Sequence, residues 1–178
     1  MPRLAGCGQQ HTSERGLNEA LILALVLTTA VAADAESQEK TVPTKLFASA
    51  AEVDAALAKA KAEHKGDNTN TVEVLGSVGT YPVQLEYRTG ATAPSMHKGQ
   101  AELIYVMDGG CTLITGSTQV GMKGSGTTVS GIRIEGGVPH KVAKGDYIMV
   151  PPDTPHRYTG LEGRFVSVTL HMPMAATH

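Results

Sequence analysis

The chain has 178 residues and a formal net charge of −2, with 15 Lys and Arg residues against 17 Asp and Glu residues. This length is typical of one domain. The near balance of charge, without a run of basic residues, gives no electrostatic basis for a nucleic-acid partner. Twenty glycines and nine prolines, with no tryptophan and two phenylalanines, predict many turns around a core that is mainly aliphatic.

The N-terminal region contains an apolar block at residues 20–33, ALILALVLTTAVAA. A membrane-spanning helix needs about 20 residues, whereas a block of this length suits the apolar part of a secretory signal. Ala30 and Ala32 offer a cleavage site just before Ala33. We therefore expect residues 1–33 to form a leader, and the protein to be periplasmic or secreted without a stable membrane anchor. Because residues 1–19 carry as many acidic as basic side chains, a buried helix in a cytoplasmic protein stays open as the alternative.

Residues 34–69 begin with a polar, mixed stretch and continue with FASAAEVDAALAKAKAEHK. Ser49, followed three residues later by Glu52, predicts a capping box at the start of a helix. Alanine dominates the interior of this segment and favours helix. Val53 and Leu57 form a narrow apolar stripe on an otherwise charged surface. We expect a linker followed by one amphipathic surface helix.

From about residue 70 onward, short β-prone runs alternate with glycine or proline, which predicts an all-β sandwich or closed barrel at residues 70–172 and a tail at 173–178. Gly109 and Gly110 are expected to form a turn between two of the strands. The glycine-rich stretch at 116–137 predicts a long hairpin with an irregular tip. The predicted strands are residues 71–78, 81–88, 102–107, 111–115, 131–134, 140–143, 146–150, 156–159 and 164–172.

One of these predicted strands begins with a carboxylate, Glu102, followed by the apolar run LIYVM. Side chains alternate between the two faces of a strand, so Glu102 shares its face with Ile104 and Val106. A carboxylate buried on that face is costly unless a cation pairs with it. His97 lies just before the strand, and an imidazole beside a buried carboxylate points to a metal ion as the partner.

The opposite face of the same strand carries Leu103, Tyr105 and Met107, all apolar. An apolar face of this kind requires a cover. Either the predicted surface helix or a second subunit could provide it.

A second informative segment is KGDYIMVPPDTPHRY, residues 144–158. Gly145 leads into a strand, two prolines end it, and the chain turns at Asp153 before His156 begins the next strand. If His156 points into the barrel, Tyr158 does so too.

Together the two segments resemble the sequence motifs of the cupin superfamily, over roughly residues 70–171. The second half of the first motif, His, four residues, Glu, six residues and Gly, is matched by His97, Glu102 and Gly109. The second motif is matched by Gly145, Pro151, Asp153 and His156, with Asp153 where the family often has glycine. The resemblance implies a single double-stranded β-helix, the jelly-roll barrel of single-domain cupins, which commonly pair as homodimers.

The resemblance also implies a metal site with His97, Glu102 and His156 as ligands. The sequence departs from the family at Ser95, which stands where the first histidine of His-x-His is expected. Two histidines and one carboxylate suit a divalent transition metal with open coordination positions, as in non-haem Fe(II) oxygenases. Iron is therefore the leading candidate, and Mn, Ni, Zn and Cu remain alternatives. Because one imidazole is lost, an empty site is a further alternative.

Four other residues are candidates for a fourth ligand position or for the pocket wall: Ser95, His140, Tyr158 and His171. Ser95 would hydrogen-bond a bound water, or is simply a loop residue. His140 would replace the missing ligand, line the pocket or face solvent. Tyr158 would be a proton donor at the pocket wall or a core residue, and His171 a structural imidazole at the rim of the barrel or a member of the site.

The functional hypothesis is an exported cupin that binds a divalent metal and acts on a small molecule, with dioxygenation as its most concrete form. The same metal site could support isomerase or lyase chemistry through the Lewis acidity of the ion. The fold alone does not determine which of these reactions takes place. The alternatives are a non-catalytic protein that binds a small ligand and a barrel with a vestigial metal site.

Overall fold

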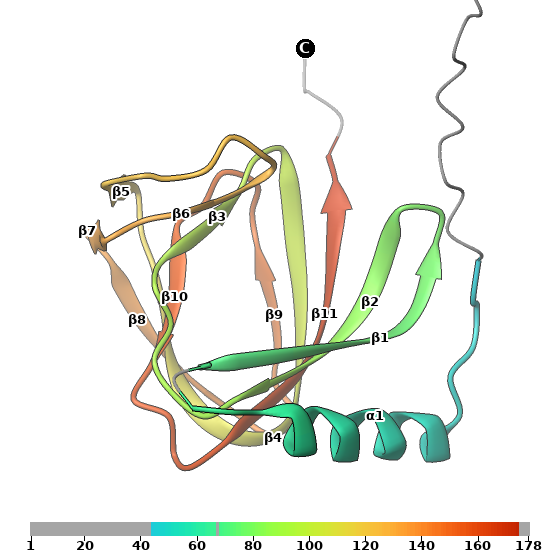
Figure 1. Ribbon diagram of the computed structural model, residues 1–178. Coiled ribbons are helices and arrows are strands. Elements are labelled where there is room, and N and C mark those ends of the chain that lie inside the picture. The colour runs from blue at the N-terminus through green and yellow to red at the C-terminus, as the bar shows by residue number, and fades with distance from the viewer. Residues whose placement is uncertain (1–43, 67, 175–178) are drawn as a thin grey trace, which may run out of the picture. The chain divides into compact units, whose positions relative to one another are not determined.

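The structure is a computed structural model that describes residues 44–66 and 68–174 (Figure 1). The predicted leader at residues 1–33, the first ten residues of the predicted linker (34–43) and the end of the predicted tail (175–178) lie outside the described residues. In the part of the chain that is described, no helix has the length and apolarity that crossing a bilayer would require.

The predicted surface helix is confirmed as α1 (Ala50–Glu63), which begins with the expected capping box. The Ser49 side chain accepts a hydrogen bond from the Glu52 backbone N–H at 3.3 Å, and the Glu52 carboxylate accepts one from the Ser49 backbone N–H at 2.8 Å. Two N–H groups that the helix itself leaves unpaired are thereby satisfied. The capping box therefore fixes where the helix starts.

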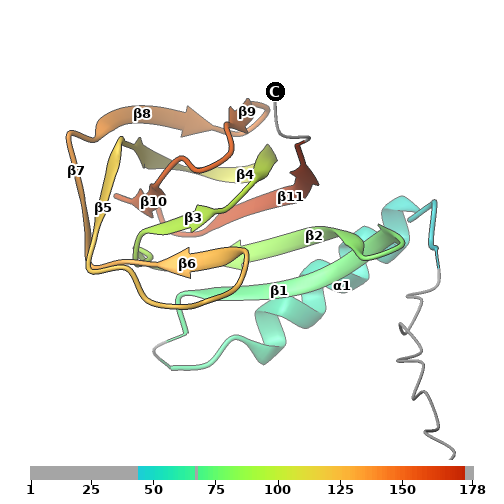
Figure 2. The same ribbon diagram turned by 90° about the horizontal axis from the view of Figure 1, so that it is seen from above.

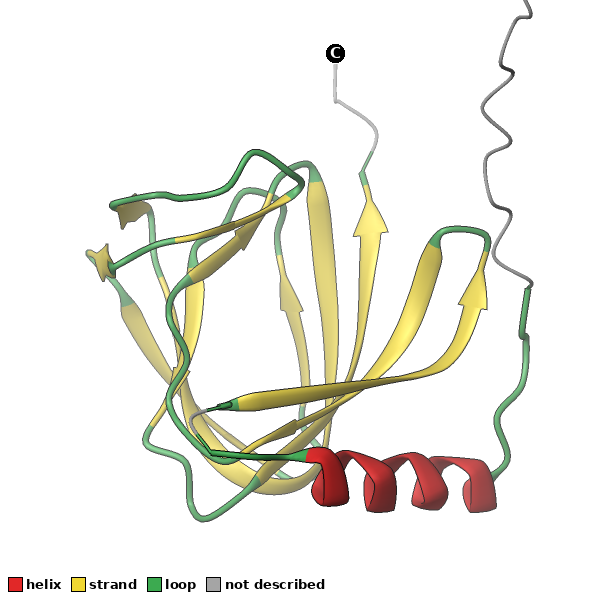
Figure 3. Cartoon of the chain, in the orientation of Figure 1, coloured by secondary structure: helices red, strands yellow, loops and turns green. Residues whose placement is uncertain are grey.

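The described residues contain eleven strands, all paired antiparallel, so the all-β prediction is confirmed (Figure 3). They are β1 (Asn70–Val78), β2 (Tyr81–Arg88), β3 (Ser95–His97), β4 (Gln100–Thr115), β5 (Thr118–Val120), β6 (Thr128–Ser130), β7 (Arg133–Glu135), β8 (Val138–Ala143), β9 (Tyr147–Val150), β10 (His156–Thr159) and β11 (Phe165–Pro173).

Strand β4 belongs to two sheets at once. Its first half pairs with β11 and β9, and the order on that side continues through β2 to β1. Its second half pairs with β10 and β8, and the order continues through β3 to β6. Seen from above, the strands curl around a common interior (Figure 2). This arrangement is the double-stranded β-helix that the resemblance implied.

The predicted turn at Gly109 and Gly110 is wrong, because β4 runs without a break from Gln100 to Thr115. Gly109 adopts φ +79°, and the register of β4 against β11 shifts near this point. The strand therefore bends from one sheet into the other instead of reversing. A Cβ atom at position 109 would overlap the carbonyl of Arg164, so only glycine fits here.

The interior of the barrel is apolar over most of its length. Ile104 and Val106 are completely buried, as the alternation along β4 predicted. Leu113, Tyr158 and Phe165 pack into the same cluster. A second apolar cluster lies outside the barrel, between α1 and the sheet, and contains Ala60, Leu75, Leu85 and Val166. The helix therefore covers part of the outer face of the sheet.

Asp153 connects the two motif segments at the turn between β9 and β10. Its backbone has φ +57°, a conformation that Asp tolerates better than most residues other than glycine. The Asp153 N–H donates a hydrogen bond to the carbonyl of His97 at 3.1 Å, and its side chain accepts one from the Gly99 N–H at 3.2 Å. Asp153 therefore ties this turn to the loop that separates His97 from Glu102.

We expect Asp153→Ala to lower the free energy of unfolding by about 1–2 kcal/mol, because alanine keeps the strained φ and loses the side-chain acceptor. Asp153→Asn keeps both the acceptor and the tolerance for positive φ, and serves as the control. Urea unfolding of the three proteins measures the difference. Equal stability of the alanine variant and the parent protein would show that the turn does not depend on this side chain.

Candidate metal centre

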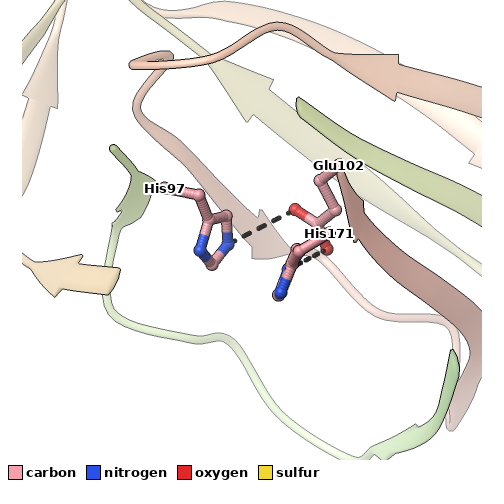
Figure 4. A group of neighbouring side chains, drawn as sticks. All are labelled: His97, Glu102 and His171. Atoms are coloured by element: carbon pink, nitrogen blue, oxygen red, sulfur yellow. Dashed lines mark ion pairs between the residues drawn. The ribbon is translucent and has the colours of Figure 1, made fainter. Parts of the chain in front are cut away.

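Glu102 lies at the start of β4 and is 2% exposed. The register of the sheet places His171 of β11 directly opposite it, so both side chains project from the same face of neighbouring strands. The two side chains point toward each other inside the barrel (Figure 4). One sheet thus contributes a carboxylate and an imidazole.

The other sheet contributes two more imidazoles. His97 ends β3 and His156 begins β10, and these strands pair through the contact of Ser95 with His156. Both histidines are buried, at 7% and 2% exposure. Residues that are about sixty positions apart in the sequence therefore face Glu102 from the opposite side.

The imidazole nitrogens surround the carboxylate at short distances. Glu102 Oε2 lies 3.0 Å from His156 Nε2 and 3.5 Å from His97 Nε2, and Glu102 Oε1 lies 3.6 Å from His171 Nε2. The ligand atoms of His97, Glu102 and His171 all lie within 4.8 Å of one another. Figure 4 shows these three side chains converging on one point.

Two of the rings are held in orientation by their other nitrogen. His156 Nδ1 donates a hydrogen bond to the carbonyl of Thr154 at 3.0 Å, and His97 Nδ1 lies 2.9 Å from the hydroxyl of Thr128. The Nε2 atoms are thereby directed at Glu102. Metal-binding histidines are oriented in the same way, by a hydrogen bond from the nitrogen that does not bind the ion.

The charges of the site follow from these contacts. Burial by itself would raise the pKa of Glu102, but its polar contacts with His156 and His171 outweigh that effect and hold the pKa well below its usual range. Burial and the nearby His171 lower the pKa of His97 to about 4. Although burial would lower the pKa of His156, its contact with Glu102 raises it. At neutral pH Glu102 is therefore an anion and His97 a neutral imidazole, the forms that bind metal.

Two buried atoms at the centre of the site have no hydrogen-bond partner among the described residues: Glu102 Oε2 and His171 Nε2. The contact of Glu102 with His156 is an ion pair by distance, without hydrogen-bond geometry. Donors bound to one ion at about 2.1 Å lie roughly 3.0–3.4 Å apart. The separations of 3.0, 3.5 and 3.6 Å between the Glu102 oxygens and the three imidazoles are close to this range. The ligand atoms of His97, Glu102 and His171 are also mutually close, so these three residues fit a divalent metal ion, with His156 beside Glu102.

The four side chains open onto a cavity of about 240 Å³. Typical pockets for drug-sized ligands are about 300–1,000 Å³, so this cavity suits a smaller molecule. Every residue that lines it has a polar or charged side chain: Asn70, Glu86, Arg88, Ser95, His97, Glu102, Thr128, His156 and His171.

Both motif segments thus meet inside an antiparallel double-stranded β-helix, with the motif histidines and glutamate directed at one point. The chain has a double-stranded β-helix fold.

Comparison with solved structures finds matches of low sequence identity with TM-scores below 0.5. No family model matches the sequence, and no curated protein matches it. Similar solved structures include the Schizosaccharomyces pombe Cnp3 cupin domain, at 8% identity over 64% of this chain and 71% of that chain, with a TM-score of 0.45. A protein with a double-stranded β-helix domain from Klebsiella pneumoniae matches at 14% identity over 64% and 85%, also with a TM-score of 0.45. The polyketide cyclase RemF from Streptomyces resistomycificus matches at 16% identity over 65% and 72%, with a TM-score of 0.43.

The barrel places two of the predicted ligands, His97 and His156, at 3.5 and 3.0 Å from the third, Glu102. The group whose ligand atoms are all mutually close contains His171 in place of His156. Ser95 lines the cavity, and its hydroxyl lies 3.2 Å from His156 Nε2. His171 also lines the cavity, so the barrel supplies an imidazole from β11 in addition to the motif residues.

The remaining two candidates lie away from the cavity lining. Tyr158 is 2% exposed and belongs to the apolar core, where its ring meets that of His156 edge to face at 6.4 Å between centroids. His140 is exposed on β8, and its Nε2 lies 3.0 Å from the hydroxyl of Thr115.

Four polar residues of the cavity were missed from the sequence: Asn70, Glu86, Arg88 and Thr128. The strand YPVQLEYR carries a signal for two of them, because Glu86 and Arg88 alternate with the apolar Leu85 and Tyr87 and so share one face of the strand. Charged residues on the face that points into a barrel indicate a polar cavity.

Metal binding can be tested with single substitutions. We expect Glu102→Gln to abolish stoichiometric metal binding, because the only anionic donor of the four is removed. His156→Gln and His171→Gln should each weaken binding by at least about tenfold, which elemental analysis and competition with a chelator measure. His140→Gln is the matched control, since that histidine is exposed and away from the cavity. Equal metal content in the His140 and His171 variants would remove His171 from the ligand set.

Proposed function

We propose that this protein is a metal-dependent cupin that binds a small molecule and acts on it inside the barrel. The observation that carries this proposal is the convergence of Glu102 and three imidazoles on one buried point, where Glu102 Oε2 and His171 Nε2 lack hydrogen-bond partners among the described residues. Glu102 would hold the ion together with His97, His156 and His171. Nitrogen and carboxylate donors suit divalent first-row transition metals.

The chain's own residues prepare the site for chemistry. A bound divalent ion supplies Lewis acidity and, in the case of iron, redox chemistry. Glu102 provides the anionic donor, and the hydrogen bonds of Thr128 and Thr154 hold His97 and His156 in place. The apolar core below the cavity excludes water from the other side of the site.

Among the reactions this site supports, we propose iron-dependent dioxygenation first. Glu102 and the imidazoles around it would hold the ion, and a bound iron would supply the redox chemistry that dioxygenation requires. We also propose that the protein is exported to the periplasm or secreted, on the strength of the apolar block at residues 20–33, which lies outside the described residues.

Expression of the full chain with its own N-terminus tests these proposals. We expect the purified protein to contain one iron per chain, to begin near Ala33, and to consume oxygen in the presence of one member of a panel of small organic acids and alcohols. Elemental analysis, N-terminal sequencing and an oxygen electrode provide the three measurements. Stoichiometric zinc without oxygen uptake would contradict dioxygenation, and the absence of any bound metal would contradict the metal-dependent function.

We further propose that the barrel pairs with a second copy of itself through the outer face of its sheet. Helix α1 packs against Met107, but a groove of about 430 Å³ remains beside it. Tyr147 and Met149 at this face are 71% and 57% exposed, and apolar surface of this kind is typical of interfaces. The groove is lined by Val53, Val83, Leu103, Tyr105, Met107, Tyr147, Val168, Thr169 and Leu170.

We expect the protein to be a dimer in solution and Tyr147→Glu to convert it to a monomer, because a charge in the middle of an apolar interface would lose its hydration on pairing. Light scattering coupled to size-exclusion chromatography gives the mass of each species. Met122→Glu alters a methionine of similar exposure, 60%, outside the groove, and should remain a dimer. A parent protein that is monomeric at high micromolar concentration would rule out this interface.

A further inference from the structure

A second charged group lies in the wall of the same cavity, on β2. Arg88 and Glu86 are each 6% exposed and form a buried ion pair. The Arg88 guanidinium also lies 4.0 Å above the ring of Tyr158, and its Nη1 donates a hydrogen bond to the hydroxyl of Ser167 at 3.4 Å. These contacts fix the plane of the guanidinium inside the barrel.

The guanidinium keeps a donor without a partner. Arg88 Nε is buried and has no hydrogen-bond partner among the described residues. Two other atoms are also buried without a hydrogen-bond partner among the described residues: Asn70 Oδ1, whose residue lines the same cavity, and the Tyr158 hydroxyl. Buried polar atoms are paired in the great majority of cases, so a residue that lines a cavity and keeps an unpaired donor has hydrogen-bonding capacity left for a ligand oxygen.

The charges of the lining indicate which kind of ligand this is. Glu86 and Glu102 contribute two negative charges and Arg88 one positive charge, which leaves −1 when the histidines are neutral. A divalent ion, whose histidine ligands are neutral, changes the total to +1. The loaded cavity therefore matches a ligand with one negative charge, and a dianion such as a phosphate monoester would leave an excess of buried charge.

We infer that the metal-loaded cavity binds a small monocarboxylate, with Arg88 as the residue that recognises its oxygens. This inference rests on the metal-binding function proposed above. A guanidinium with a fixed plane matches a planar carboxylate, and the cavity of about 240 Å³ limits the ligand to a small molecule. Glu86 acts as a positioning residue, because it forms an ion pair with Arg88 and its carboxylate has no hydrogen-bond donor to offer the anion.

The test uses the full chain loaded with Zn²⁺, with acetate as the probe and acetamide as its neutral analogue of the same shape. Isothermal titration calorimetry measures the affinity of each. We expect acetate, but not acetamide, to bind the loaded protein. The double variant Glu86→Gln/Arg88→Gln removes the guanidinium without changing the net charge, and should bind Zn²⁺ at the same stoichiometry while its affinity for acetate falls by at least about tenfold.

The chain offers a matched control in Arg133 and Glu135, an ion pair with the same spacing that lies on the exposed surface. The double variant Arg133→Gln/Glu135→Gln should bind acetate as the parent protein does. If the buried double variant does not fold, Arg88→Lys keeps the charge and the pairing with Glu86 but loses the planar fork, and the same fall in acetate affinity is expected.

The outcomes separate the inference from the function on which it rests. A parent protein that does not bind Zn²⁺ contradicts the proposed metal site. A protein that binds Zn²⁺ but not acetate, or that binds acetate equally well with and without Arg88, leaves the metal site in place and overturns the assignment of Arg88.

Discussion

The buried carboxylate of Glu102 is the constraint on which the rest of the site depends. At 2% exposure it is almost entirely removed from solvent, so its charge requires polar or cationic partners that the fold brings to it. Three imidazoles from three different strands lie within 3.6 Å of it, although His97, as a neutral imidazole, contributes no positive charge. The groups that hold the rings are the Thr128 hydroxyl, which the pairing of β3 with β6 places opposite His97, and the backbone carbonyl of Thr154. The burial of one acidic residue at the start of an apolar strand thus requires polar side chains beside it on the neighbouring strands.

Strand β4 makes this arrangement possible because it belongs to both sheets. Its first half places Glu102 beside His171, and its second half pairs with β10, the strand that begins at His156. The bend at Gly109 allows one continuous strand to serve both sheets. The hydrogen bonds of Asp153 then hold the loop after His97 against the turn before His156. Local backbone geometry at two positions therefore controls the convergence of the site.

Much of the fold and part of the site were predictable from the sequence, because the alternation of side chains along a strand depends only on local geometry. It placed Glu102 inside the barrel and Tyr105 outside it, and the capping box correctly placed the start of α1. The bend at Gly109 was not predictable, because a glycine with positive φ is compatible with a turn and with a β-bulge, and the sequence does not distinguish the two. The roles of His171 and Arg88 depend on how the register of β11 and β2 aligns them with Glu102. That register is set by closure of the barrel, which no local pattern encodes.

The electrostatics of the barrel argue that these residues serve binding rather than stability. A buried ion pair such as Glu86–Arg88 contributes little to stability, because the loss of hydration offsets the attraction between the charges. Apolar side chains fill the equivalent inward positions further along β4, at Ile104 and Val106, and show what a purely structural interior requires. The polar end instead concentrates two carboxylates, a guanidinium and three imidazoles around one small cavity. These are the groups that the proposed binding of a divalent cation, and then of a small anion, would use.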